Sequence, residues 1–220
     1  LKFIEMNNLI FTDCKFISNT AKQNTSATHP SLNGKNYFNG DGGAIQLGYI
    51  CKMNDVNLLF ENCIFKNNKA YRHGGALAIQ TIQSVTIKKC IFENNIANSE
   101  DDNRLLSENY FDLKSKGRGG AIYVNPSYSY DAPSSDCNPP LSSLKNFEIR
   151  NSEFIENIAF DGYAMYVEGE ETDSLLFDLK SNNFNNNYNP KNNNNNIYYG
   201  AVITTEICIF DINQIKADNN

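Results

Sequence analysis

The sequence lacks several features that mark common function classes. Of its 220 residues 19 are Lys or Arg and 25 are Asp or Glu, and no basic cluster offsets the formal net charge of −6. This balance argues against binding to a nucleic-acid backbone. No apolar run approaches the roughly 20 residues that a membrane-spanning helix needs. No signal-peptide pattern follows Leu1, and neither end shows an amphipathic cap, so we expect a segment of a longer solenoid that continues at both ends.

Metal-binding and catalytic patterns are also missing. The six cysteines follow no CxxC spacing, so we expect no zinc site. Residues 100–102 are acidic, but no glycine-spaced pattern of calcium ligands accompanies them. There are only two histidines, and His73 precedes a Gly-Gly turn, where we predict a surface residue. Neither a Ser-His-Asp order nor a G-x-S-x-G motif occurs. The sequence therefore predicts no catalytic residue, no metal and no cofactor.

The composition is that of a folding sequence, because 40% of the residues are hydrophobic and 12% aromatic. Roughly one residue in six is Asn, and residues 192–196 are an Asn run, a bias that favours a eukaryotic microbe, such as a protist, as the source.

An internal repeat dominates the sequence. Each of five units is anchored by a Phe: Phe16, Phe65, Phe92, Phe154 and Phe184. Three residues later each has an Asn: Asn19, Asn68, Asn95, Asn157 and Asn187. Two residues before the Phe comes a small residue: Cys14, Cys63, Cys90, Ser152 and Asn182. Downstream follows a small-residue turn and a short apolar run, as in Gly74-Gly75-Ala76-Leu77 and Gly119-Gly120-Ala121-Ile122.

The spacing within each unit is that of short strands. Counted from the Phe, positions −7, −5, −2 and 0 are apolar or small and the positions between them are mostly polar, which is period-2 patterning with a bend. The run after the glycines alternates as well, so we expect three short strands per unit. Helical periodicity is absent. The sequence predicts an all-β, right-handed parallel β-helix of about five rungs plus a partial sixth.

We treat the chain as one segment, residues 1–220. The rungs are anchored near residues 9–47, 56–79, 85–124, 147–167 and 175–203, and the main corner loops are insertions at 22–41, 98–118, 125–146 and 190–198. In a stacked solenoid equivalent residues lie about 4.8 Å apart, so we expect a Phe ladder inside and an Asn ladder that passes amide hydrogen bonds along the axis. Stacking of the rungs accounts for all of these Phe and Asn residues, so we assign them a structural role.

The loops and cysteines carry the remaining hypotheses. Insertions confined to the corners of a solenoid commonly form its binding surface, and Tyr128 and Tyr130 are candidate loop contacts. Asn24 begins an Asn-Thr-Ser glycosylation sequon. We expect the cysteines two residues before the Phe to be free and to point inward, where they pack as small apolar residues. In an oxidising compartment Cys51 or Cys137 could form a disulfide between loops. We assign no role to Cys208.

The pairing of Phe-x-x-Asn with Gly-Gly-Ala-(Ile/Leu/Val) resembles the repeat of the chlamydial polymorphic outer membrane proteins and of related protist surface proteins. It covers residues 9 to about 203, with Phe65 to Asn68 and Gly74 to Leu77 as one matching pair. The fourth unit departs at Tyr163 and the fifth at Tyr199. The resemblance implies a right-handed β-helix, a location at the cell surface or outside the cell, and a role in adhesion.

Parallel β-helices also include pectin-lyase-like enzymes, so we tested for paired carboxylates, which glycoside hydrolysis needs about 5 to 9.5 Å apart. Two outward columns, at Phe −4 and Phe +1, place no two carboxylates on adjacent rungs. Their residues are Thr12, Glu61, Lys88, Arg150 and Lys180, and Ile17, Lys66, Glu93, Ile155 and Asn185.

The function we predict is therefore a non-enzymatic scaffold that binds partners through its corner loops. Two alternatives stay open: a structural extracellular filament or coat spacer, and a carbohydrate-active enzyme with its site partly outside this segment. Expected partners are flanking β-helix of the same protein, a protein or glycan on another cell or matrix, or neighbouring copies.

Overall fold

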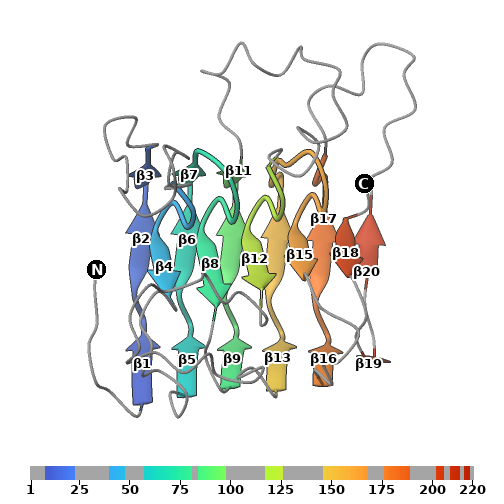
Figure 1. Cartoon of the computed structure of the whole chain (residues 1–220). Coiled ribbons are helices and arrows are strands. Elements are labelled where there is room, and N and C mark those ends of the chain that lie inside the picture. Colours follow the sequence, from blue (N-terminus) through green and yellow to red (C-terminus); the bar gives the residue numbers. More distant parts are fainter. Residues whose placement is uncertain are drawn as a thin grey trace, which may run out of the picture.

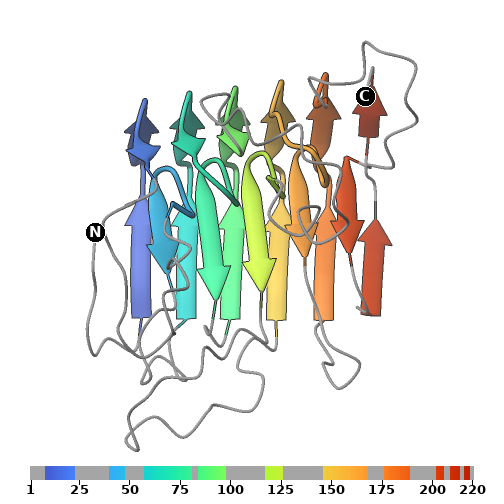
Figure 2. The same cartoon turned by 45° about the horizontal axis from the view of Figure 1, so that its top comes forward.

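The structure is a computed structural model that describes residues 8–22, 40–47, 57–80, 84–97, 117–125, 146–167, 176–188, 202–205, 209–213 and 216–218. All regular elements in these residues are short strands, and they form four parallel sheets. Each sheet takes one strand from each successive rung, so the strands lie side by side in chain order (Figures 1 and 2). The part of the chain that is described contains no helix long and apolar enough to cross a membrane.

The two largest sheets each have six strands. Sheet A consists of β1 (Asn8–Thr12), β5 (Asn57–Glu61), β9 (Ser84–Lys88), β13 (Asn146–Arg150), β16 (Leu176–Lys180) and β19 (Ile209–Asn213). Sheet B consists of β2 (Lys15–Ile17), β6 (Ile64–Lys66), β10 (Ile91–Glu93), β14 (Glu153–Ile155), β17 (Asn183–Asn185) and β20 (Lys216–Asp218).

Two smaller sheets complete each turn of the chain. Sheet C consists of β3 (Thr20–Ala21), β7 (Lys69–Ala70) and β11 (Ile96–Ala97). Sheet D consists of β4 (Ile45–Leu47), β8 (Leu77–Gln80), β12 (Ile122–Asn125), β15 (Met165–Val167) and β18 (Ile203–Thr205). We expected three strands per rung, and the short strand of sheet C is the one that we missed, because two residues are too few to show an alternating pattern.

The rungs stack in the register that the repeat predicts. Phe16 pairs with Phe65, Phe65 with Phe92, Phe92 with Phe154 and Phe154 with Phe184, always in parallel. Two parallel strands that pair need a crossover connection between them. Here the connection is the remainder of the rung, which runs through the other sheets before the chain returns to the first. The prediction of an all-β parallel β-helix, extending into a sixth rung in sheets A and B, is confirmed.

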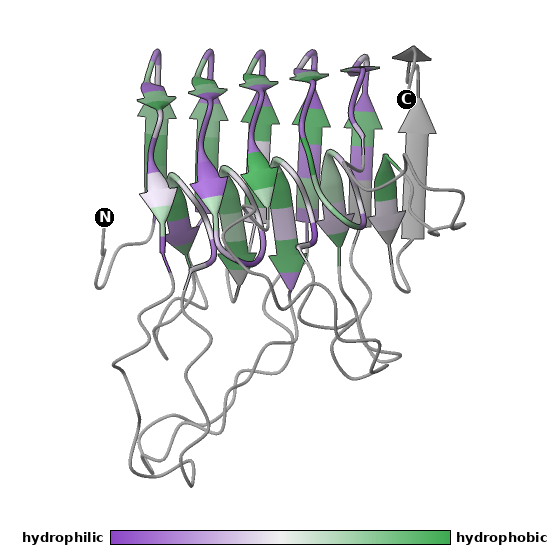
Figure 3. Cartoon of the chain, turned by 90° about the horizontal axis from the view of Figure 1, so that it is seen from above, coloured by the Kyte–Doolittle hydropathy of each residue, from purple (hydrophilic) through white to green (hydrophobic). Residues whose placement is uncertain are grey.

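The core lies inside the ring of sheets. In strands β5, β9 and β13 every second residue is buried, and the residues between them are half-buried or exposed. The alternation arises because successive side chains point to opposite faces of a strand. Hydrophilic and hydrophobic segments alternate along the strands in Figure 3. The inward residues of sheets A, B and D form one continuous apolar cluster.

Two corners of each of the first five rungs have left-handed backbone. One corner lies between sheets A and B and the other between sheets B and C, and each of these residues has φ between 50° and 56°: Asp13, Ser18, Asn62, Asn67, Lys89, Asn94, Asn151, Glu156, Ser181 and Asn186. Asn is among the few residues other than Gly that adopt this conformation readily. Half of the ten are Asn, so the fold itself accounts for part of the Asn bias of the sequence.

The Gly-Gly turn has a separate reason at each glycine. The first glycine has positive φ, for example +64° at Gly74 and +68° at Gly119. The second glycine lies directly under the next rung, so a Cβ added at Gly75 would lie 2.0 Å from the carbonyl oxygen of Gly120. Tyr163 takes this second position in the fourth rung, and the equivalent residues of the fifth rung lie outside the described residues.

Candidate functional site

The five anchor phenylalanines form a stack along the axis of the helix. Consecutive ring centroids lie 4.7–4.8 Å apart and the rings are within 9° of parallel. The spacing equals the distance between hydrogen-bonded strands. Phe65, Phe92, Phe154 and Phe184 are completely buried, and full burial of a Phe side chain contributes about 1.5–3 kcal/mol. These four buried rings leave no surface for a ligand.

The asparagines three residues later form a second, polar ladder. The Oδ1 of Asn95 accepts the backbone N–H of Asn68 at 3.1 Å and the Nδ2–H of Asn68 at 2.9 Å. The Nδ2 of Asn95 donates to the Oδ1 of Asn157 and to the carbonyl oxygen of Phe65, both at 2.9 Å. The same pattern runs from Asn19 to Asn187. Each buried amide thus uses both donors and its oxygen, as burial requires.

The column two residues before the Phe also forms a hydrogen-bonded ladder. The N–H of Cys63 donates to the Sγ of Cys90 at 3.4 Å, and the N–H of Cys90 donates to the Oγ of Ser152 at 3.1 Å. The N–H of Ser152 donates in turn to the Oδ1 of Asn182 at 3.0 Å. Cys14, Cys63 and Cys90 are free thiols, and burial raises the pKa of Cys90 to about 12. Cys63 and Cys90 belong to the apolar core and Cys14 packs against it, so the prediction of free, inward cysteines is confirmed. The thiols also form the weak hydrogen bonds of this ladder.

A buried polar corner precedes the Gly-Gly turns. Our prediction that His73 is a surface residue is wrong, since its exposed fraction is 4%. Its ring stacks on Tyr123 at 4.5 Å and its Nδ1 accepts the backbone N–H of Arg118 at 3.3 Å. Burial, followed by the charges of Arg72 and Arg118, lowers the pKa of His73 well below its usual value. No pattern in the sequence indicates this packing, because Tyr123 belongs to a different column of the next rung.

Two arginines tie this corner together. Arg72 forms a two-point ion pair with Asp41, whose exposed fraction is 2%. The guanidinium of Arg118 lies 4.5 Å from the centre of the Tyr166 ring, a cation–π contact. Asp41 also accepts the backbone N–H of His73 at 3.2 Å. These contacts bind neighbouring rungs to one another, which is a structural role.

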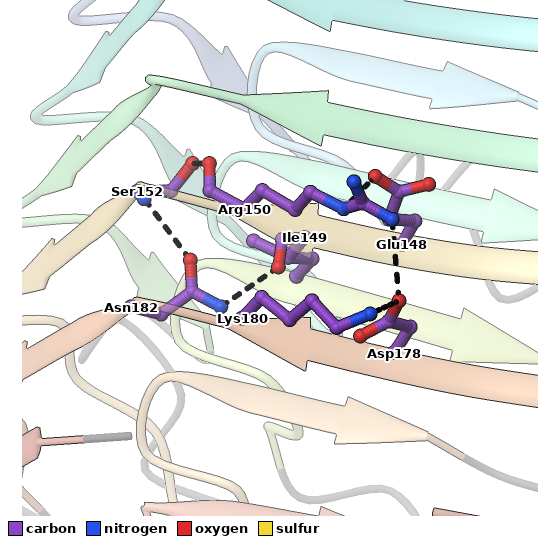
Figure 4. A network of polar contacts seen from close by, with 7 residues as sticks. All are labelled: Glu148, Ile149, Arg150, Ser152, Asp178, Lys180 and Asn182. Carbon is purple, nitrogen blue, oxygen red and sulfur yellow. Dashed lines mark hydrogen bonds and ion pairs between the residues drawn. The ribbon is translucent and has the colours of Figure 1, made fainter. Parts of the chain in front are cut away.

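The outer face of sheet A carries two parallel rows of charge (Figure 4). In one row Glu148 lies beside Asp178, and in the other Arg150 lies beside Lys180. Arg150 forms ion pairs with Glu148 and, at 3.4 Å, with Asp178, and Lys180 pairs with Asp178 at 3.0 Å. The cation row continues at Lys88, which is in register with Arg150.

This acid row is the arrangement that our test of the sequence missed. We examined positions −4 and +1 from the Phe, whereas Glu148 and Asp178 occupy position −6 on adjacent rungs. Counting every outward column of the longest strand would have found them. Each carboxylate forms an ion pair with a cation of the neighbouring row. The arrangement fits a charged contact surface better than a catalytic pair.

The remaining candidates lie outside the described residues: Asn24, Tyr128 and Tyr130, the cysteines Cys51, Cys137 and Cys208, and nearly all of the predicted corner loops. Among the residues that the structure does describe, no group of three or more His, Cys, Asp or Glu side chains is arranged to hold a metal ion.

Comparison with known families gives a match in the centre of the chain. Residues 62–80 and 89–125 match the model of the Chlamydia polymorphic membrane protein repeat. No curated protein and no solved structure matches the chain. The matched segments contain Phe65, Asn68, Phe92 and Asn95 of the two ladders and the glycines of two turns. The matched residues therefore include those that stack the rungs, and this part of the chain is similar to the polymorphic membrane protein repeat.

Proposed function

We propose that this chain is a non-enzymatic scaffold at the cell surface, which displays corner loops to a protein or glycan partner. The observation that carries the proposal is the use of the repeated residues. In the second and third rungs the Phe, the Asn and the glycines are all used for stacking, with buried rings and fully hydrogen-bonded amides. The rungs thereby form a rigid support, and the differences in length between the units are confined to the corners, where binding loops of solenoids occur.

The repeat family supports the location. Polymorphic membrane proteins, whose repeat model matches residues 62–80 and 89–125, are membrane proteins by name, and a surface location suits a chain built for display. An adhesive role is consistent with this location, and so is binding to neighbouring copies or to a flanking β-helix of the same protein.

A purely structural spacer is the second candidate, since the continuous ladders would serve a filament or coat equally well. The two roles differ in what the loops do. A scaffold for adhesion loses binding when its loops are removed, whereas a spacer keeps its function.

The test is to immobilise the chain and expose it to a panel of oligosaccharides, matrix proteins and cells, with retained and cleaved species identified by mass spectrometry. Retention without cleavage supports the proposal. Cleavage of a glycan would refute it and turn attention to Glu148 and Asp178. A chain that retains nothing from the panel would contradict the adhesive role and favour the spacer.

A further inference from the structure

The outer face of sheet A is complementary to itself. This face is the widest in the molecule, with six strands of five residues each. Two of its three outward columns are positions −6 and −4 of each rung. In the first five rungs the −6 column reads Ile10, Leu59, Thr86, Glu148 and Asp178, and the −4 column reads Thr12, Glu61, Lys88, Arg150 and Lys180.

The charges on these columns are separated by sign in the fourth and fifth rungs. Acids occupy one column and cations the other, and Arg150 and Lys180 remain 40% and 38% exposed after forming their ion pairs within the chain. The same face is apolar at the first rung, where the side chain of Ile10 is 64% exposed.

We propose that two copies of the chain associate through this face, side by side and with their helix axes parallel. A two-fold axis that runs along the helix axis, between the two columns, places each −6 residue opposite the −4 residue of the same rung in the other copy. Glu148 then faces Arg150 and Asp178 faces Lys180. A two-fold interface is isologous, so every such contact occurs twice.

The same symmetry creates no contact between like charges in the other rungs. Ile10 faces Thr12, Leu59 faces Glu61 and Thr86 faces Lys88. The antiparallel arrangement, with the two-fold axis along the strands, places each column against itself with the order of the rungs reversed. Wherever the charged fourth and fifth rungs of the two copies overlap, acids then lie opposite acids and cations opposite cations. Because like charges that meet across an interface are unfavourable, the charge pattern selects the parallel arrangement.

The area of this face indicates how strong the association is. Six strands spaced about 4.8 Å apart, with five residues of about 3.3 Å each, cover about 480 Å² per copy. The total of about 950 Å² is below the size of stable interfaces, about 1,200 Å² or more. We therefore expect weak pairing that becomes substantial when copies are held close together on one surface. This inference does not depend on the corner loops, so it can fail without affecting the proposed function.

The test uses variants whose faces carry one sign of charge. The acidic variant is R150E/K180E and the basic variant is E148K/D178K. Sedimentation velocity over a concentration series, at low and high salt, measures association, and circular dichroism during heating shows that each variant is folded. We expect the unmodified chain to self-associate weakly and to lose association as salt screens the charges. Each variant alone should associate at least about tenfold more weakly, and an equimolar mixture should associate more tightly than the unmodified chain.

Two controls make the result specific. The variant K66E changes the net charge by the same two units as R150E, and it breaks the comparable Lys66–Glu93 ion pair of 2.7 Å on sheet B; it should associate like the unmodified chain. If a single-sign variant does not fold, the exchange E148R/R150E keeps the two columns complementary and must associate normally. An unmodified chain that stays monomeric, a mixture that does not associate, or an exchange variant that folds but loses association would overturn the proposal.

Discussion

Replacement of Asn95 by Asp is a sharp perturbation of the fold, because it changes one atom type and almost no volume. In the structure the Nδ2 of Asn95 donates to Asn157 Oδ1 and to the Phe65 carbonyl, and the side chain is completely buried. In Asn95→Asp an oxygen replaces this nitrogen and faces two acceptors. The ladder then contains a buried carboxylate without a partner cation.

The magnitude follows from the two ways in which the protein can respond. An uncompensated buried charge costs about 3–5 kcal/mol. If the carboxyl instead stays protonated in the folded state, it costs about 1.4 kcal/mol for each pH unit above about 3.9, and hence about 4 kcal/mol at pH 7. Burial raises the pKa of this carboxyl in the folded state, so the unfolded chain ionises first. The destabilisation therefore grows as the pH rises through 4 and is smallest in acid.

The assay is urea unfolding followed by circular dichroism at pH 4 and pH 7, with Asn67→Asp as the control. Asn67 lies in the same rung stack, but it is exposed at a left-handed corner, where Asp is tolerated and the change should stay within about 0.5 kcal/mol. A loss for Asn95→Asp that is small, or equal at both pH values, would refute the assignment of a directional, fully buried amide ladder.

Three further predictions follow from the turn, the thiols and the buried histidine. Gly75→Ala should destabilise the chain by about 3 kcal/mol or more, because the new Cβ would lie 2.0 Å from the carbonyl oxygen of Gly120 and the backbone of two rungs would have to shift; a cooperative melt near that of the unmodified chain would contradict this. Cys90→Ser should change stability by no more than about 1 kcal/mol, since Ser occupies the same column one rung later and makes the same bonds, and in the unmodified chain the Cys90 thiol should react with a thiol reagent only on unfolding. The lowered pKa of His73 means that the unfolded chain gains its proton first, so stability should fall by about 1.4 kcal/mol per pH unit as the pH drops below about 6.5. His73→Gln should remove that slope in urea titrations, and a slope that persists would assign it to other groups.

The ladders are predictable from the sequence because they are consequences of period and register. Once Phe recurs with Asn three residues later, parallel stacking brings each pair of equivalents to one strand spacing, whatever the length of the loops between. The 62-residue separation between Asn95 and Asn157 has no effect on their contact. The same logic predicts the Gly-Gly turns, because they recur at a corresponding place in successive units.

Contacts between unlike columns are not predictable in this way. His73 stacks on Tyr123, which belongs to another column of the next rung, and its burial depends on how the corner folds onto sheet D. The acid row of Glu148 and Asp178 can be found by aligning the units, as the ladders are. It is easily missed, because the other rungs have different residue types at this position. The repeat identifies what is shared between rungs, whereas a surface formed by only two or three rungs needs each outward column to be examined.

The measurement that tests the central claim most directly is to replace residues 98–116 and 126–145 by short linkers and compare the variant with the unmodified chain on the ligand or cell that the chain retains. Circular dichroism and urea unfolding establish whether the rungs persist. If the rungs serve as a support for binding loops, the variant keeps its strand signal and its cooperative unfolding but loses retention. Full retention by the folded, shortened variant would contradict the account and assign binding to the wall of the β-helix.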